Sequence, residues 1–383
     1  MRAITFLQPM RLSFGLGCAG EGVDYLKQLP ERRIHIVASR SLSSVAARIR
    51  EQLEADGCAV SLDAAAVAEP TIAAFEESLA RARAFSPSCI VGIGGGSALD
   101  VAKLIAAFIN NPQTVQESFG IGLLRSRNCH LVCMPATSGT GSEVSPNAIL
   151  LDERAQLKKG VISPYLVPDA AFVDPALTRS VPPAITAYTG LDALTHCVEA
   201  YTNRFAHPLV DLYALEGISL CARFLPGAVR DGEDMEAREG MSLASLYGGL
   251  CLGPVNTAAV HALAYPLGGE FHLPHGLSNA VLLPAVFRFN APSTPERHAS
   301  VARALGVEPH GTALETAMAG AARLEQLTHD CGVGTDLAHH GLQRSAIPHM
   351  ATAAMTVTRL LGNNPREITQ RDAEWIYGQC FGG

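Results

Sequence analysis

Residues 91–108 read VGIGGGSALDVAKLIAAF, and in this stretch three consecutive glycines join a strand pattern to a helix pattern. Glycine has no side chain, so the backbone can approach a ligand closely, and the free N–H groups that open the helix attract phosphate oxygens. We therefore expect a diphosphate-binding turn at Gly94, Gly95, Gly96 and Ser97. The alternative is a turn without a ligand, because the GK[ST] ending of a Walker loop is missing and the GxGxxG fingerprint is matched imperfectly.

The segments around this turn alternate between short runs rich in β-branched residues and helical patterns. Strand-like runs are 33–39 (RIHIVAS), 58–64 (CAVSLDA), 86–94 (SPSCIVGIG), 130–136 (HLVCMPA) and 147–152 (NAILLD), and helical patterns are 42–57 and 71–85. Such alternation predicts a parallel sheet with helices on both faces. The fold class we expect is therefore α/β for the first half of the chain.

The composition changes near residues 180–190, SVPPAITAYTG. Beyond this point long helical patterns such as residues 207–225, HPLVDLYALEGISLCARFL, dominate, and β-branched alternation nearly disappears. A chain of 383 residues is too long for a single core. We expect two domains, an α/β nucleotide-binding domain over residues 1–181 and an all-helical domain over residues 182–383.

The overall composition excludes several classes of protein. With 48% hydrophobic and 17% charged residues the chain is globular, and its net charge of −7 argues against a general nucleic-acid or anionic-membrane surface. We expect no signal peptide, no membrane span and a cytoplasmic location. The ten cysteines form no CxxC pair, so we expect buried thiols rather than a disulfide framework.

Polar residues follow the glycine turn in two places. Asp100 and Lys103 lie on the predicted helix, where they either orient the turn or are solvated. Residues 134–148, MPATSGTGSEVSPNA, interleave glycines with the hydroxyl residues Thr137, Ser138, Thr140 and Ser142. These hydroxyls suit the ribose and phosphates of a nucleotide, and a flexible surface loop is the alternative interpretation.

Two further segments offer metal ligands. Residues 189–202, TGLDALTHCVEAYT, place Asp192 and His196 on one face of a helix, where the two side chains could also form only a local hydrogen bond. Together with His261 and His275 they supply one carboxylate and three imidazoles, a set that suits Zn²⁺ or Fe²⁺ better than Ca²⁺ or Mg²⁺. A dinucleotide site and such a metal indicate hydride transfer to or from an alcohol or carbonyl carbon.

Over nearly its whole length the sequence resembles the iron-dependent, or group III, alcohol dehydrogenases. The motifs that carry the resemblance, in the order and spacing of that family, are GGGSALDVAK, PATSGTGSEV, KKGVISPYLVPDAAFVDP, TGLDALTHCVEAYT and HALAYPLGGEFHLPHGLSNAVLLP. The resemblance implies a dehydroquinate synthase-like fold, with a dinucleotide-binding α/β domain before an all-helical metal domain and the active site between them. It also implies a homodimer, an NAD or NADP cofactor, Fe²⁺ or Zn²⁺, and a small alcohol or aldehyde substrate.

The resemblance also implies roles for single residues. It makes Asp192, His196, His261 and His275 the metal ligands. It places Gly95, Gly96 and Ser97 on the pyrophosphate, Thr137 and Thr140 near the nucleotide, Lys158 near the nicotinamide ribose, and Asp100 towards the nicotinamide.

The sequence departs from the family pattern in two places. Many members have aspartate at the end of the first strand, where this chain has Ser39 and Arg40, so the choice between NAD and NADP stays open. Many also have a histidine where this chain has Tyr265, one helical turn after His261. Tyr265 is a poorer proton relay than histidine but can bind the cofactor or a water, or it only packs against neighbouring residues. His272 matches no ligand position and either lines the cleft or packs.

Three functions compete at this point. The first is a metal-dependent NAD(P)-linked alcohol dehydrogenase or aldehyde reductase. The second is a related reductase that works without metal, similar to maleylacetate reductase. The third is a nucleotide-binding protein without catalysis, for which an intact metal set would have no explanation.

Overall fold

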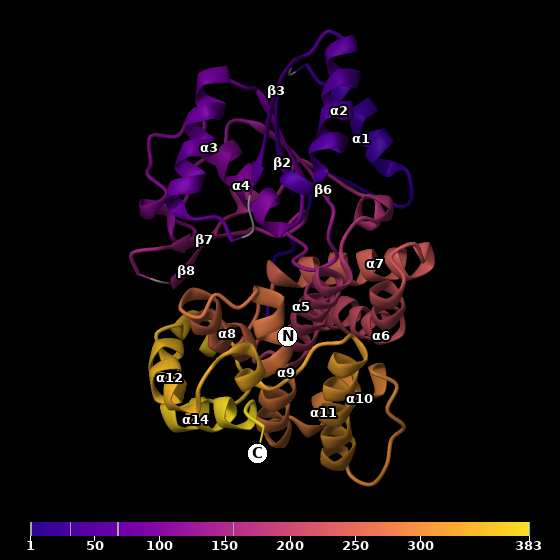
Figure 1. Ribbon diagram of the computed structural model, residues 1–383, viewed down its shortest axis with the longest axis vertical. Coiled ribbons are helices and arrows are strands. Elements are labelled where there is room, and N and C mark those ends of the chain that lie inside the picture. Colours follow the sequence, from indigo (N-terminus) through magenta and orange to yellow (C-terminus); the bar gives the residue numbers. More distant parts are fainter. Residues whose placement is uncertain (1, 31, 67–68, 156, 383) are drawn as a thin grey trace. The chain divides into compact units, whose positions relative to one another are not determined.

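The computed structural model describes residues 2–30, 32–66, 69–155 and 157–382. These residues form two compact units (Figure 1). One unit is made of residues 6–137 and 141–179. The other unit consists mainly of the chain from Ser180 onward. It also includes two earlier segments, residues 138–140 and the segment that ends at Thr5.

The first unit contains a six-stranded sheet in which every pair of neighbouring strands is parallel. In the order β1-β9-β6-β4-β2-β3, the strands are β1 (Arg11–Phe14), β9 (Ala170–Val173), β6 (His130–Pro135), β4 (Cys89–Gly94), β2 (Arg33–Ser39) and β3 (Ala59–Ala66). The predicted parallel sheet is therefore confirmed. β4 and β6 pair from Cys89 opposite His130 to Gly94 opposite Pro135, so that both strands end side by side.

Helices cover both faces of this sheet because the apolar residues of each strand alternate between two cores. The helices are α1 (Cys18–Gln28), α2 (Ser43–Ala55), α3 (Ile72–Phe85) and α4 (Gly96–Phe108). In β4, Val91 and Ile93 pack with α1 and α2, whereas Ile90 packs with α3 and α4. Figure 1 shows α3 on one side of the sheet and α1 and α2 on the other.

A smaller sheet, which the sequence did not lead us to expect, completes this unit. It has the order β5-β8-β7, with β5 (Gly120–Ile121) parallel and β7 (Asn147–Asp152) antiparallel to β8 (Leu157–Ile162). Short 3₁₀ turns are η1 (Arg40–Leu42), η2 (Gln116–Ser118), η3 (Pro164–Leu166) and η4 (Pro175–Thr178).

Among its described residues the second unit contains helices and 3₁₀ turns but no strand, as the change in composition predicts. Its helices are α5 (Pro183–Thr202), α6 (Pro208–Arg230), α7 (Met235–Leu252), α8 (Ala259–Gly269), α9 (His275–Asn290), α10 (Pro295–Ala304), α11 (Ala313–Asp330), α12 (Ile347–Met355), α13 (Thr358–Leu361) and α14 (Gln370–Gln379), with 3₁₀ turns η5 (Ala291–Ser293), η6 (Leu337–His340) and η7 (Arg344–Ala346). Local sequence starts several of these helices. Proline opens α5, α6 and α10, and capping boxes at Thr312 and Thr369 open α11 and α14.

The core of this unit surrounds α5, which is buried from Thr186 to its end apart from Tyr188 and Thr189, and which packs against α6, α7 and α9. By length and composition alone α6 would be able to cross a membrane, but a core helix has the same composition. All ten cysteines of the chain are free and buried, which confirms the expectation of reduced, buried thiols.

Helices α5 and α9 meet with their backbones in contact at Gly276. A methyl group placed on Gly276 would lie 2.1 Å from the carbonyl oxygen of Tyr188 in α5. Since backbone atoms cannot move aside as the end of a side chain can, only glycine fits here. This contact sets the distance between two helices that carry Asp192 and His275.

We predict that Gly276→Ala destabilises the protein by about 1–3 kcal/mol, because the added methyl group pushes α9 away from α5. Urea unfolding monitored by circular dichroism measures this change. The matched control is Gly378→Ala, a helical glycine in α14 with open space around it. The control should leave stability unchanged or raise it by up to about 1 kcal/mol. Equal stability of Gly276→Ala and the parent would show that the two backbones do not touch.

Candidate functional site

The glycine turn lies among the ends of three neighbouring strands. Gly94 ends β4 with φ at +150°, and a methyl group placed on it would lie 2.1 Å from the Ser39 hydroxyl oxygen at the end of β2. A methyl group on Gly95 would lie 3.2 Å from the Thr137 side chain, just beyond β6. The structure thus brings together residues that the sequence predicts around a dinucleotide, at the carboxyl ends of parallel strands, where α/β folds bind ligands.

The helix that follows the turn fixes a loop through Asp100 and Lys103. Lys103 is fully buried, and its ammonium group donates to the carbonyl oxygens of Ser142 at 2.8 Å, Ser145 at 2.9 Å and Asn147 at 2.5 Å. Asp100 accepts a hydrogen bond of 2.5 Å from the Ser142 hydroxyl. The interpretation that Lys103 is solvated is therefore wrong. Asp100 and Lys103 instead orient the loop around Ser142, which belongs to the segment with the predicted hydroxyl residues.

Lys158, predicted near the nicotinamide ribose, is paired with an acidic residue that the sequence analysis missed. Its ammonium group lies 2.7 Å from Oε1 of Glu69. The backbone N–H of Glu69 donates to the Ser97 hydroxyl at 3.2 Å, so Glu69 links Lys158 to the glycine turn. Arg40, next to Ser39, is exposed and has no ion-pair partner among the residues that the structure describes.

Ser138 and Thr140 belong to the helical unit rather than to the α/β unit. The Ser138 hydroxyl lies 3.2 Å from the hydroxyl of Ser242 in α7. Gly139, between Ser138 and Thr140 in the sequence, packs closely against Thr189 of α5. A methyl group placed on Gly139 would lie 2.8 Å from the Cβ atom of Thr189.

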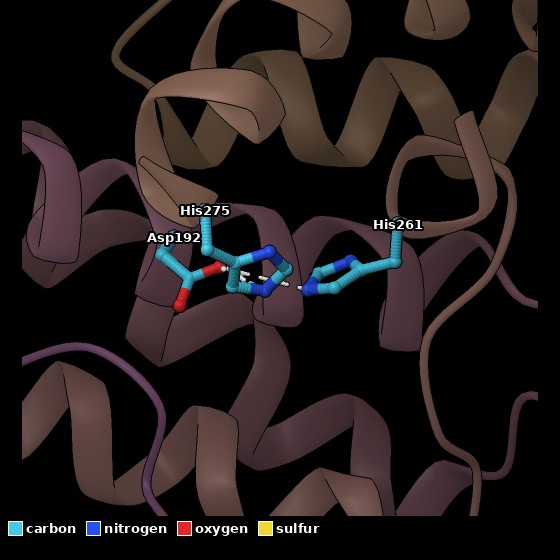
Figure 2. A group of neighbouring side chains, drawn as sticks. All are labelled: Asp192, His261 and His275. Atoms are coloured by element: carbon cyan, nitrogen blue, oxygen red, sulfur yellow. Dashed lines mark ion pairs between the residues drawn. The ribbon is translucent and has the colours of Figure 1, made fainter. Parts of the chain in front are cut away.

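The four predicted metal ligands converge in the helical unit. Asp192 and His196 come from α5, His261 from α8 and His275 from α9 (Figure 2 shows three of them). The Nε2 atoms of His261, His275 and His196 lie 3.5, 3.7 and 3.8 Å from Asp192 Oδ1. The ligand atoms of Asp192, His261 and His275 all lie within 4.8 Å of one another.

This geometry fits a small divalent cation. The separations from Asp192 Oδ1 exceed normal hydrogen-bond lengths of about 2.7–3.2 Å. Ligand atoms at about 2.1 Å around a tetrahedral ion would stand roughly 3.4 Å apart, close to the distances of 3.5–3.8 Å from Asp192 Oδ1 to the three nitrogens. Carboxylate oxygen and imidazole nitrogen are also the donors that Fe²⁺ and Zn²⁺ accept.

In this cluster burial and neighbouring charges shift the pKa values of Asp192 and His261 in opposite directions. Burial alone would raise the pKa of Asp192, but the adjacent histidines hold it well below its usual range. Burial alone would lower the pKa of His261, but Glu199 and Asp192 raise it to about 9. Burial lowers the pKa of His196 to about 4. Without an ion, the cluster therefore keeps Asp192 in its negatively charged form.

Two residues that the sequence analysis missed hold these ligands. Glu199 accepts hydrogen bonds of 2.6 Å from His261 Nδ1 and 2.6 Å from the backbone N–H of Val260. The side-chain amide of Asn279 donates to Asp192 Oδ1 at 2.7 Å. Spacing offered a signal for both, because Glu199 lies seven residues after Asp192 and Asn279 four residues after His275, each on the same helical face.

Tyr265 and His272 differ in their surroundings. Tyr265 is buried in α8, and burial raises its pKa, whereas the positive charge of Arg359 lowers it. His272 is exposed and has φ at +55° in the segment before α9. His272 does not belong to the group of ligand atoms described above.

Comparison with known proteins agrees with both units. The family model described as iron-containing alcohol dehydrogenase matches residues 9–175, and the model for the C-terminal part of the Fe-containing alcohol dehydrogenase family matches residues 186–381. Long-chain-alcohol dehydrogenase 1 of Geobacillus thermodenitrificans is 36% identical, over 96% of this chain and 94% of that protein.

Solved structures show the same fold. A crystal structure of 1,3-propanediol oxidoreductase has a TM-score of 0.95 at 31% identity and covers 99% of this chain and 100% of that chain. Sulfoacetaldehyde reductase from Bifidobacterium kashiwanohense, solved in complex with NAD⁺, has a TM-score of 0.88 at 27% identity and covers 99% of both chains. The chain belongs to the iron-containing alcohol dehydrogenase family and is an oxidoreductase that acts on CH–OH groups.

Proposed function

We propose that the protein transfers hydride between a nicotinamide cofactor and a small alcohol or aldehyde, with Asp192, His196, His261 and His275 holding a divalent metal. The observation that carries this proposal is the convergence of three imidazole nitrogens on Asp192 Oδ1. A bound Fe²⁺ or Zn²⁺ polarises an alcohol or carbonyl oxygen. The protein's contribution is a rigid set of donors drawn from three helices.

The proposed cofactor site begins at the glycine turn. The bare backbone of Gly94, Gly95 and Gly96 and the first N–H groups of α4 suit a pyrophosphate. Ser39, Ser97 and Thr137 surround that turn, and Lys158 is linked to it through Glu69. Ser138, Thr140 and Asp100 complete the set that we assign to the nucleotide. The relative solved with NAD⁺ supports this kind of cofactor.

Within the proposed active site Tyr265 is the candidate for proton handling. It lies one helical turn after His261, and the positive charge of Arg359 lowers the pKa of its hydroxyl, against the larger effect of burial. A tyrosine hydroxyl can donate to or accept from a water or a substrate oxygen. We assign His272, which is exposed, a place at the substrate entrance.

We propose a domain boundary at about residue 181 and activity as a homodimer in the cytoplasm, with neither nucleic acid nor membrane as partner. The net charge of −7 and the free thiols support the location and the absence of an anionic partner. The resemblance to the family supports the dimer.

Metal removal tests the proposal. We predict that chelation abolishes oxidation of small alcohols, that Fe²⁺ or Zn²⁺ restores it, and that His275→Ala lowers kcat/KM by more than about 100-fold with loss of bound metal. Metal analysis and absorbance at 340 nm provide the two readouts. The control is the surface variant His329→Ala. Full activity in protein shown to be free of metal would favour the metal-independent reductase instead.

The residues at the end of β2 predict tolerance of NADP. Ser39 carries no negative charge to repel a 2′-phosphate, and the exposed Arg40 lacks an ion-pair partner among the described residues. Arg40→Ala should therefore lower kcat/KM with NADP about 10-fold, which is the effect expected from the loss of roughly one charge-assisted hydrogen bond. The value of kcat/KM with NAD should stay nearly unchanged. Measuring both cofactors with both proteins gives the ratio, and an unchanged ratio would remove Arg40 from cofactor selection.

A third variant tests the hydroxyl of Tyr265. Tyr265→Phe should lower kcat by about 10-fold or more at unchanged metal content, because only the oxygen is removed. The matched control is Tyr377→Phe in α14. This change removes a buried hydroxyl that donates to the carbonyl oxygen of Leu263, a residue of α8 like Tyr265. This control should lower stability by about 1 kcal/mol but not kcat. Parent kinetics in Tyr265→Phe would exclude a catalytic hydroxyl, and lost metal would place Tyr265 in the ligand set.

A further inference from the structure

Glu199 is a buried carboxylate that the proposed reaction does not use directly. Its side chain lies inside the helical unit on the same face of α5 as Asp192 and His196. Neither Lys nor Arg forms an ion pair with it among the residues that the structure describes, and its two oxygens contact α8 instead. Burial of a carboxylate without a Lys or Arg partner is unfavourable, so we looked for a role of Glu199 in its contacts with α8.

Each oxygen of Glu199 has a different donor. Oε1 accepts from the backbone N–H of Val260, in the first turn of α8, and Oε2 accepts from Nδ1 of His261. A carboxylate only accepts, so in the neutral ring Nδ1 carries the hydrogen and Nε2 has the lone pair that can bind a cation. Nε2 faces Asp192 Oδ1, at 3.5 Å, and the side-chain amide of Asn279, whose Nδ2 lies at 3.2 Å.

We propose that Glu199 is a positioning residue of the metal site, which sets the orientation of the His261 ring and the nitrogen that it offers to the cation. This inference rests on the proposed metal site. Glu199 acts through His261 and is not itself a ligand. The bond to Val260 makes the arrangement stiff, because it ties the same carboxylate to the backbone that carries the ring.

The variant Glu199→Gln tests this role sharply. Glutamine has a single acceptor oxygen, whereas Val260 N–H and His261 Nδ1 each need one. If the oxygen serves Val260, the amide NH₂ faces Nδ1 and favours the ring form whose hydrogen lies on Nε2, towards Asp192. We expect affinity for Zn²⁺ to fall 10–100-fold, about the effect of losing such a partner of a metal-bound histidine.

The experiment measures Zn²⁺ affinity by competition with a chromophoric chelator, and the absorption spectrum of the Co²⁺-loaded protein, in the full chain. The control is Thr202→Val, which removes a buried hydroxyl that donates to Val198 on the same helix but does not touch the site. A weaker affinity and an altered Co²⁺ spectrum in Glu199→Gln alone support the proposal. Parent affinity in Glu199→Gln, or equal losses in both variants, would overturn it.

Two further outcomes are also decisive. If the parent binds no metal, the proposed function fails and the role of Glu199 fails with it. If Glu199→Gln does not fold, as judged by circular dichroism of the metal-free protein, Glu199→Asp replaces it. Aspartate keeps both acceptors but withdraws them from His261, so affinity should still fall by several-fold. Parent affinity in Glu199→Asp would then overturn the proposal.

Discussion

One carboxylate oxygen, Asp192 Oδ1, is the point on which the helical unit depends. Three imidazole nitrogens lie within 3.8 Å of it, one from α5 itself and two from the consecutive helices α8 and α9. A buried carboxylate is unfavourable unless its surroundings compensate the charge, so α5, α8 and α9 have to meet at this atom. The backbone contact at Gly276 makes this meeting possible, because any larger residue would hold α9 away from α5.

The α/β unit depends on a different constraint, which is the close approach of the carboxyl ends of β2, β4 and β6. Gly94 is confined by Ser39 and Gly95 by Thr137, so the ends of three parallel strands leave bare backbone at the start of α4. Lys103 of α4 fixes the loop after β6 by donating to three of its carbonyl oxygens. Bare backbone is therefore what this unit offers to phosphate oxygens, whereas the helical unit offers converging side chains to a cation.

These constraints explain what the sequence predicted. Strand runs and the glycine turn predicted the parallel sheet, and helical periodicity predicted the second unit, because both patterns are local. The strand at residues 157–162 was missed because its two lysines obscure the apolar alternation. Lys103 and Glu199 were missed as buried groups because a charged residue in a helix usually faces water, and their acceptors and donors come from distant segments. Spacing on α5 was the only signal for Glu199.

Charge compensation links Glu199 to the kind of ion that the site suits. Asp192 and Glu199 bring two negative charges into the interior, and among the described residues their ion-pair partners are histidines alone. Neutral imidazoles that act as ligands leave both charges uncompensated, and a divalent cation cancels them. A monovalent ion would leave one buried negative charge, and a trivalent ion one positive charge, each unfavourable in a medium of low dielectric constant. The contact that orients His261 therefore also favours Fe²⁺ or Zn²⁺ by charge, whereas ligand type separates these ions from Mg²⁺ and Ca²⁺.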